Sequence, residues 1–300
     1  MSVKPTNPQI NRSHPLARGL VGAWAFQDGG GGDDAREIGK GNLTATKYYS
    51  GALSWERCEL GSAVALGGAG YVIDGFPFLQ QFTLSAWLRV SSWTAGHSSS
   101  DTPIFCQYLT TGNKRMWLLI RDSDTNKFYM RVSDNGAFAG HYTDVFFGGA
   151  IESAPWAKFR HVVLTANNAT RKWDLYIDRP WETASSQIKH WSLTQSRSYV
   201  DRGTSLYVAA YGPMTGATSF SIADLKAFNR VLSPSEIADL YARPFDLYEP
   251  AVGIQERYYR ANAPIGAIGT GLHAIEAGGV YGAPGINSGL HAIDTGVVTA

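Results

Sequence analysis

The chain of 300 residues contains only two cysteines, Cys58 and Cys106. Two cysteines so far apart form neither a disulfide framework nor the closely spaced ligand pairs of a zinc site. We therefore expect two reduced and mostly buried thiols, which pack like small apolar side chains.

Charge is also scarce. Charged residues make up 17% of the chain, and 26 Lys and Arg nearly balance 25 Asp and Glu, for a net charge of +1. This balance argues against a nucleic-acid partner, because such a protein needs a basic surplus to neutralise phosphates. No run of 18 apolar residues occurs, so we expect no membrane-spanning helix. The polar first residues lack an apolar leader segment, so we expect no secretory signal.

Large apolar side chains and glycine are plentiful. The chain has an apolar fraction of 44%, with nine Trp, 15 Tyr, 13 Phe and 33 Gly. This composition supports one large core and many tight turns. Short runs rich in β-branched and aromatic residues recur between residues 20 and 228, with turn residues between them. Many short strands with almost no helix indicate an all-β sandwich.

The clearest strand pair lies at residues 156–180. Trp173, Leu175 and Ile177 alternate with polar residues, which is the pattern of a strand with one buried face. The preceding run, residues 158–166, is apolar on both faces. A strand of that kind lies inside a sheet that is covered on both sides, so we predict a central position for this hairpin.

One helix is predicted near residues 233–242. Ser233 and Glu236 have the spacing of a capping box, and Pro234 occupies the first helical position. An apolar stripe follows at Ile237, Leu240 and Tyr241, and Pro244 ends the helix.

The composition changes after Pro250. Residues 271–278, GLHAIEAG, recur 18 positions later as residues 289–296, GLHAIDTG. Each copy can form one strand, and two isolated strands bury no core, so we expect them to pair with the sandwich, a symmetry mate or another protein. The expected partner-binding residues are Ile268, Leu272, His273, Ile275, Ile286, Leu290, His291 and Ile293.

Four stretches, taken in order, resemble the laminin-G-like, or concanavalin A-like, jelly-roll family, and its phage-encoded branch in particular. They are NRSHPLARGLVGAW at residues 11–24, FTLSAWLRV at residues 82–90, the hairpin from Trp156 to Asp178, and SIADLKAFNRVLSPSEIADLY at residues 221–241. The resemblance implies a sandwich of two antiparallel sheets over residues 19–248. We expect an extended N-terminal arm at residues 1–18 and a Gly-rich β extension at residues 249–300.

Catalytic patterns are absent or weak, and we expect no enzyme activity. A glycoside hydrolase needs two carboxyl groups around the scissile bond. Asp174 and Asp178 share a strand face, but Lys172 lies there too, which favours a solvated polar face. His161 lies among apolar strand residues and is interpreted as structural. Acids flank Gly29–Gly32, unlike a phosphate-binding loop.

The resemblance implies one metal site and no other cofactor. Many relatives bind calcium between an early loop and the closing strand. The corresponding oxygen ligands here are Asp33, Asp34, Glu37 and Asp224. Two positions depart from the family: Glu37 stands where Asp is usual, and Ala223 where an acid is frequent.

The phage resemblance implies a non-enzymatic virion structural protein, made in the bacterial cytoplasm. The favoured form is a capsid decoration or cement protein, anchored or oligomerised through its C-terminal extension to capsid or other virion proteins. A homo-oligomer is expected, with a trimer as one form that suits threefold sites. The alternative is a carbohydrate-binding, lectin-like module of a tail or fibre that attaches to host or environmental glycans. Its candidate sugar platforms are Trp93, Tyr108, Tyr142, Trp181 and Trp191.

Overall fold

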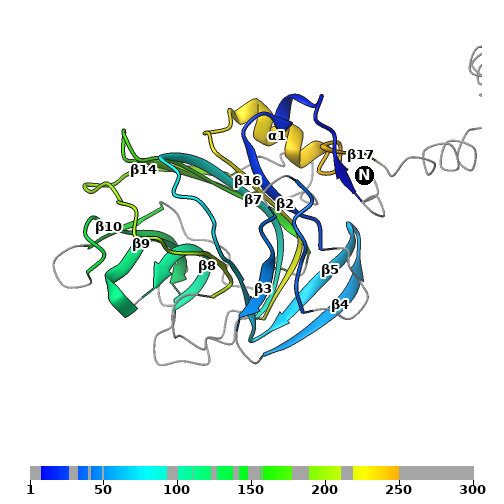
Figure 1. Cartoon of the computed structure of the whole chain (residues 1–300), viewed down its shortest axis with the longest axis horizontal. Coiled ribbons are helices and arrows are strands. Elements are labelled where there is room, and N and C mark those ends of the chain that lie inside the picture. Colours follow the sequence, from blue (N-terminus) through cyan, green and yellow to red (C-terminus); the bar gives the residue numbers. More distant parts are fainter. Residues whose placement is uncertain are drawn as a thin grey trace, which may run out of the picture. The chain divides into compact units, whose positions relative to one another are not determined.

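The computed structural model describes residues 8–26, 33–39, 42–48, 51–92, 101–109, 111–122, 127–137, 142–147, 156, 158–177, 189–210 and 219–249. All of them belong to Met1–Pro250, the first of two units of the chain. Their strands form two large antiparallel sheets with an apolar core between them (Figure 1). The predicted all-β sandwich is confirmed.

The larger sheet contains eight strands within the described residues. Its order is β14 (Lys189–Thr194), β13 (Lys172–Ile177), β12 (Arg160–Asn167), β7 (Gln81–Ser92), β16 (Ser219–Phe228), β5 (Gly61–Gly67) and β4 (Ala52–Cys58), and β2 (Leu20–Trp24) also pairs with β16. The predicted hairpin is β12–β13. Because β12 pairs with both β13 and β7, it lies inside the sheet as expected.

The second sheet contains seven strands among the residues described. Its order is β11 (Tyr142–Phe146), β10 (Lys127–Ser133), β9 (Lys114–Asp122), β8 (Asp101–Leu109), β15 (Leu206–Val208), β6 (Gly70–Ile73) and β3 (Ala45–Tyr48). A short 3-10 turn, η2 (Thr111–Asn113), joins β8 to β9.

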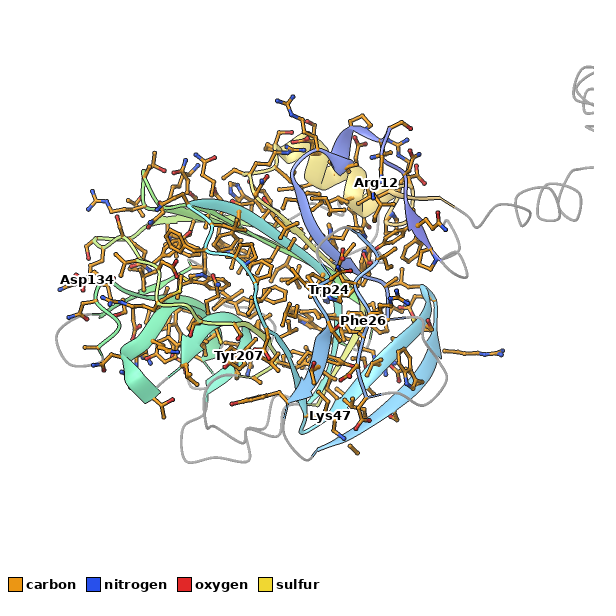
Figure 2. The ribbon with its side chains drawn as sticks, in the orientation of Figure 1. Arg12, Trp24, Phe26, Lys47, Asp134 and Tyr207 are labelled. Atoms are coloured by element: carbon orange, nitrogen blue, oxygen red, sulfur yellow. The ribbon has the colours of Figure 1, made fainter. Side chains whose placement is uncertain are left out.

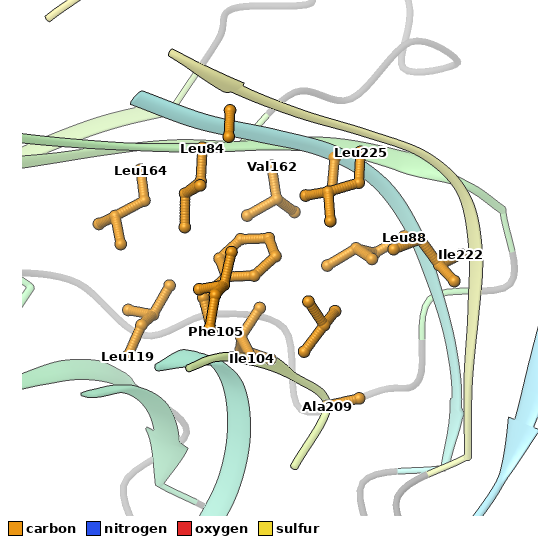
Figure 3. Packing of buried hydrophobic residues seen from close by; sticks show 14 of the residues in the cluster. Leu84, Leu88, Ile104, Phe105, Leu119, Val162, Leu164, Ala209, Ile222 and Leu225 are labelled. Carbon is orange, nitrogen blue, oxygen red and sulfur yellow. The ribbon is translucent and has the colours of Figure 1, made fainter. Parts of the chain in front are cut away.

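The core lies between the two sheets. Phe82, Leu84, Ala86 and Leu88 alternate along β7 and all belong to it, as a period of two requires. In Figure 3, side chains of the eight-stranded sheet face those of the seven-stranded sheet; the labelled examples are Leu84, Leu164 and Leu225 against Phe105 and Leu119. Cys106 is buried and Cys58 half-buried, and the two do not form a disulfide.

A second apolar layer covers the other side of the eight-stranded sheet. Helix α1 (Pro234–Ala242) lies there (Figure 1) and buries Ile237 and Leu240. Its capping box is present: Ser233 Oγ accepts from the Glu236 amide at 3.3 Å, and Glu236 Oε2 accepts from the Ser233 amide at 2.8 Å. Within the described ranges, α1 and the 3-10 turns are too short to cross a membrane, and no candidate span is found.

The described part of the N-terminal arm packs beside this helix. Strand β1 (Gln9–Ile10) pairs with β17 (Tyr248–Glu249), and the 3-10 turn η1 (Pro15–Ala17) is capped by His14 Nδ1. Leu16 is buried in the same cluster as Ile237. The arm therefore includes a short turn and a two-residue strand, in addition to the extended backbone that the sequence predicts.

Candidate functional site

The side of the seven-stranded sheet that is turned away from the core carries an aromatic cluster, which we call the tyrosine face. It consists of Val72, Cys106, Tyr108, Leu118, Ile120, Tyr129 and Tyr207, with Tyr48 packed against them. Side chains alternate along a strand, so Tyr129 lies on this face while its neighbours Phe128 and Met130 belong to the core. The sheet is thus apolar on both sides.

One end of the tyrosine face is a pair of phenol rings. Tyr48 on β3 and Tyr207 on β15 meet edge to face, with ring centroids 5.1 Å apart (Tyr207 is labelled in Figure 2). Burial raises the pKa of Tyr207 to about 12, and the neighbouring Tyr48 adds to the shift. The Tyr207 ring therefore acts as a neutral apolar group at physiological pH.

The other end carries an ion pair. Arg131 on β10 and Asp144 on β11 are cross-strand partners, and the guanidinium binds the carboxylate through two bonds of 2.7 Å. Burial alone would lower the pKa of Arg131, but the bonds to Asp144 and the nearby Tyr129 raise it above its usual range. This bidentate geometry holds the guanidinium and the carboxylate in one plane, and we call the pair the Arg131–Asp144 fork.

An exposed ring lies beside this fork. Phe146 is the cross-strand partner of Tyr129, their centroids are 5.3 Å apart, and Phe146 is 45% exposed. The Arg131 guanidinium lies 5.6 Å from the Tyr129 centroid. An apolar platform with a few fixed polar groups is the usual composition of a small-molecule site, and this one suits an uncharged ring that carries hydroxyls.

The second arginine of this region is also engaged. The guanidinium of Arg115 lies 5.8 Å from the Tyr108 centroid, and its Nη1 donates to the Gly136 carbonyl at 3.2 Å. Burial raises the pKa of Tyr108, although Arg131 and Arg115 oppose the shift. Tyr108 therefore stays a neutral phenol.

The four acids assigned to calcium do not form a common ligand set. Asp33 pairs with Lys47 Nζ at 3.1 Å, and Asp34 accepts from the Lys47 amide at 3.4 Å. Glu37 accepts from the amides of Ala23 and Gly39. Asp224 binds Lys226 and Tyr248. No group of three or more His, Cys, Asp or Glu that could hold a metal occurs in the described residues. The arrangement does not fit calcium, because the acids already have other partners.

His161 has the structural role that the sequence indicates. Its Nε2 lies 2.7 Å from Ser85 Oγ, and its ring stacks on Trp87, with Tyr241 packed beside both rings. Burial, followed by the charge of Lys226, lowers the pKa of His161 to about 3. The imidazole is therefore neutral at physiological pH, and α1 covers it.

The comparison with protein families decides the classification. The model of the concanavalin A-like lectin/glucanases superfamily, Laminin_G_3, matches residues 66–238. The chain belongs to this superfamily. A search of the curated proteins found no match.

Solved structures resemble this concanavalin A-like domain in fold. The binding domain of Paraclostridial Mosquitocidal Protein 1 has a TM-score of 0.53 and 15% identity, over 76% of this chain and 53% of that one. The botulinum neurotoxin serotype G binding domain has a TM-score of 0.50 and 12% identity, over 74% of this chain and 50% of that one. The chain spans about half the length of these toxin domains. Identities this low show the fold alone.

The acids considered for hydrolysis are differently placed in this concanavalin A-like domain. Asp174 is only 6% exposed, which corrects the expected solvated face. His190 on β14 binds its Oδ1 through Nε2 at 2.9 Å and stacks on Tyr176 with centroids 4.3 Å apart. Lys172 lies 3.5 Å from the same carboxylate. Asp178 lies outside the described residues.

The other residues that the sequence analysis singled out have different positions. Tyr108 lies on the tyrosine face, whereas Trp191 packs against the core of the domain. Tyr142 belongs to β11, but its side chain is not described. The following lie outside the described residues: Trp93, Trp181, Gly29–Gly32, Ile268, Leu272, His273, Ile275, Ile286, Leu290, His291 and Ile293.

Sequence reasoning missed the four residues at the edge of the tyrosine face. Tyr129 and Arg131 alternate with core residues along β10, and Asp144 and Phe146 are likewise two positions apart on β11. That alternation was the available signal. The pairing of the two strands, which brings the four side chains together, is not visible in either segment alone.

Proposed function

We propose that this chain is a non-catalytic, lectin-like module that binds neutral glycans at the Phe146 edge of the tyrosine face. The observation that carries the proposal is the exposed Phe146 ring, which lies beside the fixed Arg131–Asp144 fork. A sugar ring can lay its apolar face on the aromatic side chain while its hydroxyls bond to the polar pair. Family membership supports a binding module, since the superfamily includes lectins.

The preference for neutral glycans follows from the charges at this edge. Recognition of an acidic sugar would favour a guanidinium fork with both bonds available for the sugar carboxylate. The Nε and Nη2 atoms of Arg131 already bind Asp144. Each Asp144 oxygen keeps further acceptor capacity, which sugar hydroxyls can use.

The absence of catalysis is part of the same proposal. Asp144 is held by Arg131, Asp174 by His190 and Asp224 by Lys226. A glycoside hydrolase needs two carboxyl groups around the scissile bond, and each of these three carboxylates already binds another side chain.

Replacing Phe146 by alanine tests the glycan site. We expect this change to weaken binding of the best glycan from a neutral array about tenfold, since a lost stacking contact is worth roughly 1 kcal/mol or slightly more. Isothermal titration calorimetry measures the effect. Val200→Ala is the matched control, because Val200 is 37% exposed and lies outside the tyrosine face. Binding that is absent from the whole array, or equal in both variants, would contradict the proposal.

A second level of function comes from the C-terminal extension. We propose that the module is part of a phage virion, as a capsid decoration or cement protein, and that the extension anchors it or joins copies. The 18-residue repeat supports this, because its two largely apolar copies, each with a single acid, can add as strands to a partner through backbone hydrogen bonds. The resemblance of residues 11–24 to phage proteins supports the same location.

Removing residues 251–300 tests the anchor. We expect the truncated chain to stay folded, because every described strand and helix precedes residue 250. We also expect it to lose oligomerisation and binding to particles that lack the protein. Light scattering and co-sedimentation measure these outcomes, with circular dichroism as the folding control. A truncated chain that assembles and docks like the full chain would refute the anchor role.

A further inference from the structure

A charged cluster is buried beneath the segment that leads to residue 249. Asp224 and Lys226, on β16, are each 1% exposed, and Lys226 Nζ donates to the Asp224 carboxylate. Nζ also donates to the Pro244 carbonyl at 3.0 Å and lies 4.8 Å from the Tyr248 ring centroid. The Tyr248 hydroxyl donates to the other Asp224 oxygen at 2.6 Å.

Asp224 and Lys226 are two positions apart and therefore share a face of β16. The backbone of β16 explains why this face is turned away from the core, although Ile222 points into it. The register between β16 and β7 shifts between Ile222 and Asp224, so that Ala223 is an extra residue. Such a bulge re-aims the side chains that follow it. Ile222 and Leu225 remain in the sandwich core, whereas Asp224 and Lys226 both face the layer formed by the terminal segments.

The early loop reaches the same place. Glu37 accepts from the Ala23 amide at 3.3 Å, and Ala23 is the cross-strand partner of Lys226. The Glu37 charge also acts on Tyr248, whose pKa is raised first by burial and then by Asp224 and Glu37. The loop, the closing strand and the segment after α1 therefore meet around Tyr248, Asp224 and Lys226, where Asp224 binds an ammonium group.

We propose that the Lys226 ammonium does in this chain the work that the family resemblance assigns to calcium. It neutralises Asp224, and through Pro244 and Tyr248 it fastens the segment 244–249 to the sheet. The Asp224 carboxylate binds a cation of the protein itself and not an exchangeable metal ion. The segment 244–249 is therefore held against the sheet without a metal. This inference does not depend on glycan binding.

Thermal unfolding of the full chain tests the proposal. The unfolding temperature should be the same in excess calcium and in excess EDTA. Lys226→Met, which keeps the length of the side chain and removes its charge, should lower that temperature by on the order of 10 °C, because it leaves Asp224 buried without a cation. Lys172→Met is the matched control: Lys172 is also two residues from an aspartate on a strand, but its side chain is 53% exposed. It should change the temperature little.

Two results would overturn the proposal: stabilisation of the natural chain by calcium, or a Lys226→Met variant that unfolds at the natural temperature. If Lys226→Met does not fold, the double variant Asp224→Asn with Lys226→Met decides, because it removes the charge that needs the cation. The proposal expects the double variant to fold and to be insensitive to EDTA. If the double variant also fails to fold, then Lys226 does not act by neutralising the Asp224 charge, and the proposal fails.

Discussion

Replacing Trp117 by alanine is expected to lower the free energy of unfolding by about 3–5 kcal/mol. Trp117 belongs to β9 of the seven-stranded sheet and is 1% exposed. Its ring stacks on Phe82 of the opposite sheet, with centroids 4.9 Å apart, and lies 5.9 Å from Trp173. The change therefore opens a cavity where the two sheets meet.

A lost hydrogen bond adds to this cavity. Trp117 Nε1 donates to Gln107 Oε1 at 3.0 Å, and Gln107 is 2% exposed. Trp117→Phe keeps one aromatic ring and so opens a smaller cavity, but it still leaves Gln107 Oε1 without its donor, which we expect to cost about 1–3 kcal/mol. Urea unfolding measures both variants. Trp55→Ala is the control, because Trp55 is only half-buried on the edge strand β4. Equal losses for Trp117→Ala and Trp55→Ala would show that the sheets do not pack through Trp117.

The pH dependence of stability is expected to carry a contribution from His161. The folded pKa of His161 is about 3, below the usual value of 6.5, because the ring is buried against Trp87 and Tyr241 and faces the Lys226 charge. Above pH 6.5 the ring is neutral in both states and costs nothing. As the pH falls from 6.5 toward 3, the unfolded chain binds a proton that the folded chain does not. Stability then falls by about 1.4 kcal/mol per pH unit from this group.

A non-titrating variant isolates this contribution. We compare the unfolding free energy of the natural chain with that of His161→Asn. Between pH 6 and pH 4, the natural chain should lose about 1.4 kcal/mol of stability relative to the variant for each unit by which the pH falls. Glu236, whose pKa is lowered to about 2 chiefly by Arg230, is the same in both chains and cancels. Denaturant unfolding at several pH values measures the difference. A constant difference would mean that His161 is protonated in the folded state.

Local patterns in the sequence predicted much of the fold. The alternation of apolar and other residues at positions 82–90 indicates a strand with two different faces, as β7 has: Leu84 lies in the core, while Ser85 on the opposite face bonds to His161. The spacing of Ser233 and Glu236 predicted the start of α1. These features depend on neighbours within a few residues, which a single sequence shows directly.

Three strands of the two large sheets were not predicted, because their local patterns are weak. Strand β4 has the sequence ALSWERC, and β14 has KHWSLT; both are edge strands with polar residues among the apolar ones. Strand β3, also at an edge, has only four residues. Edge strands bury less apolar surface, so their sequences carry less of the period-2 signal. Without β14, the burial of Asp174 by His190 could not be foreseen.

The candidate sites depend on pairings between distant segments. Arg131 and Asp144 meet only because β10 and β11 are adjacent and in one register. The partners of Asp224 depend on distant segments in the same way. The bulge at Ala223 puts Asp224 on the opposite side of the sheet from Ile222, so that Asp224 and Lys226 both face the segment around Pro244 and Tyr248. Neither feature can be read from local periodicity.

The most direct test of the central claim is a titration of the isotope-labelled full chain with a neutral glycan, followed by nuclear magnetic resonance. The account predicts that the largest chemical-shift changes occur at Tyr129, Arg131, Asp144 and Phe146, and that added salt alters the affinity little, because no net charge is paired. Shift changes confined to other residues, or binding of acidic glycans alone that weakens with salt, would contradict a neutral-glycan site on the tyrosine face.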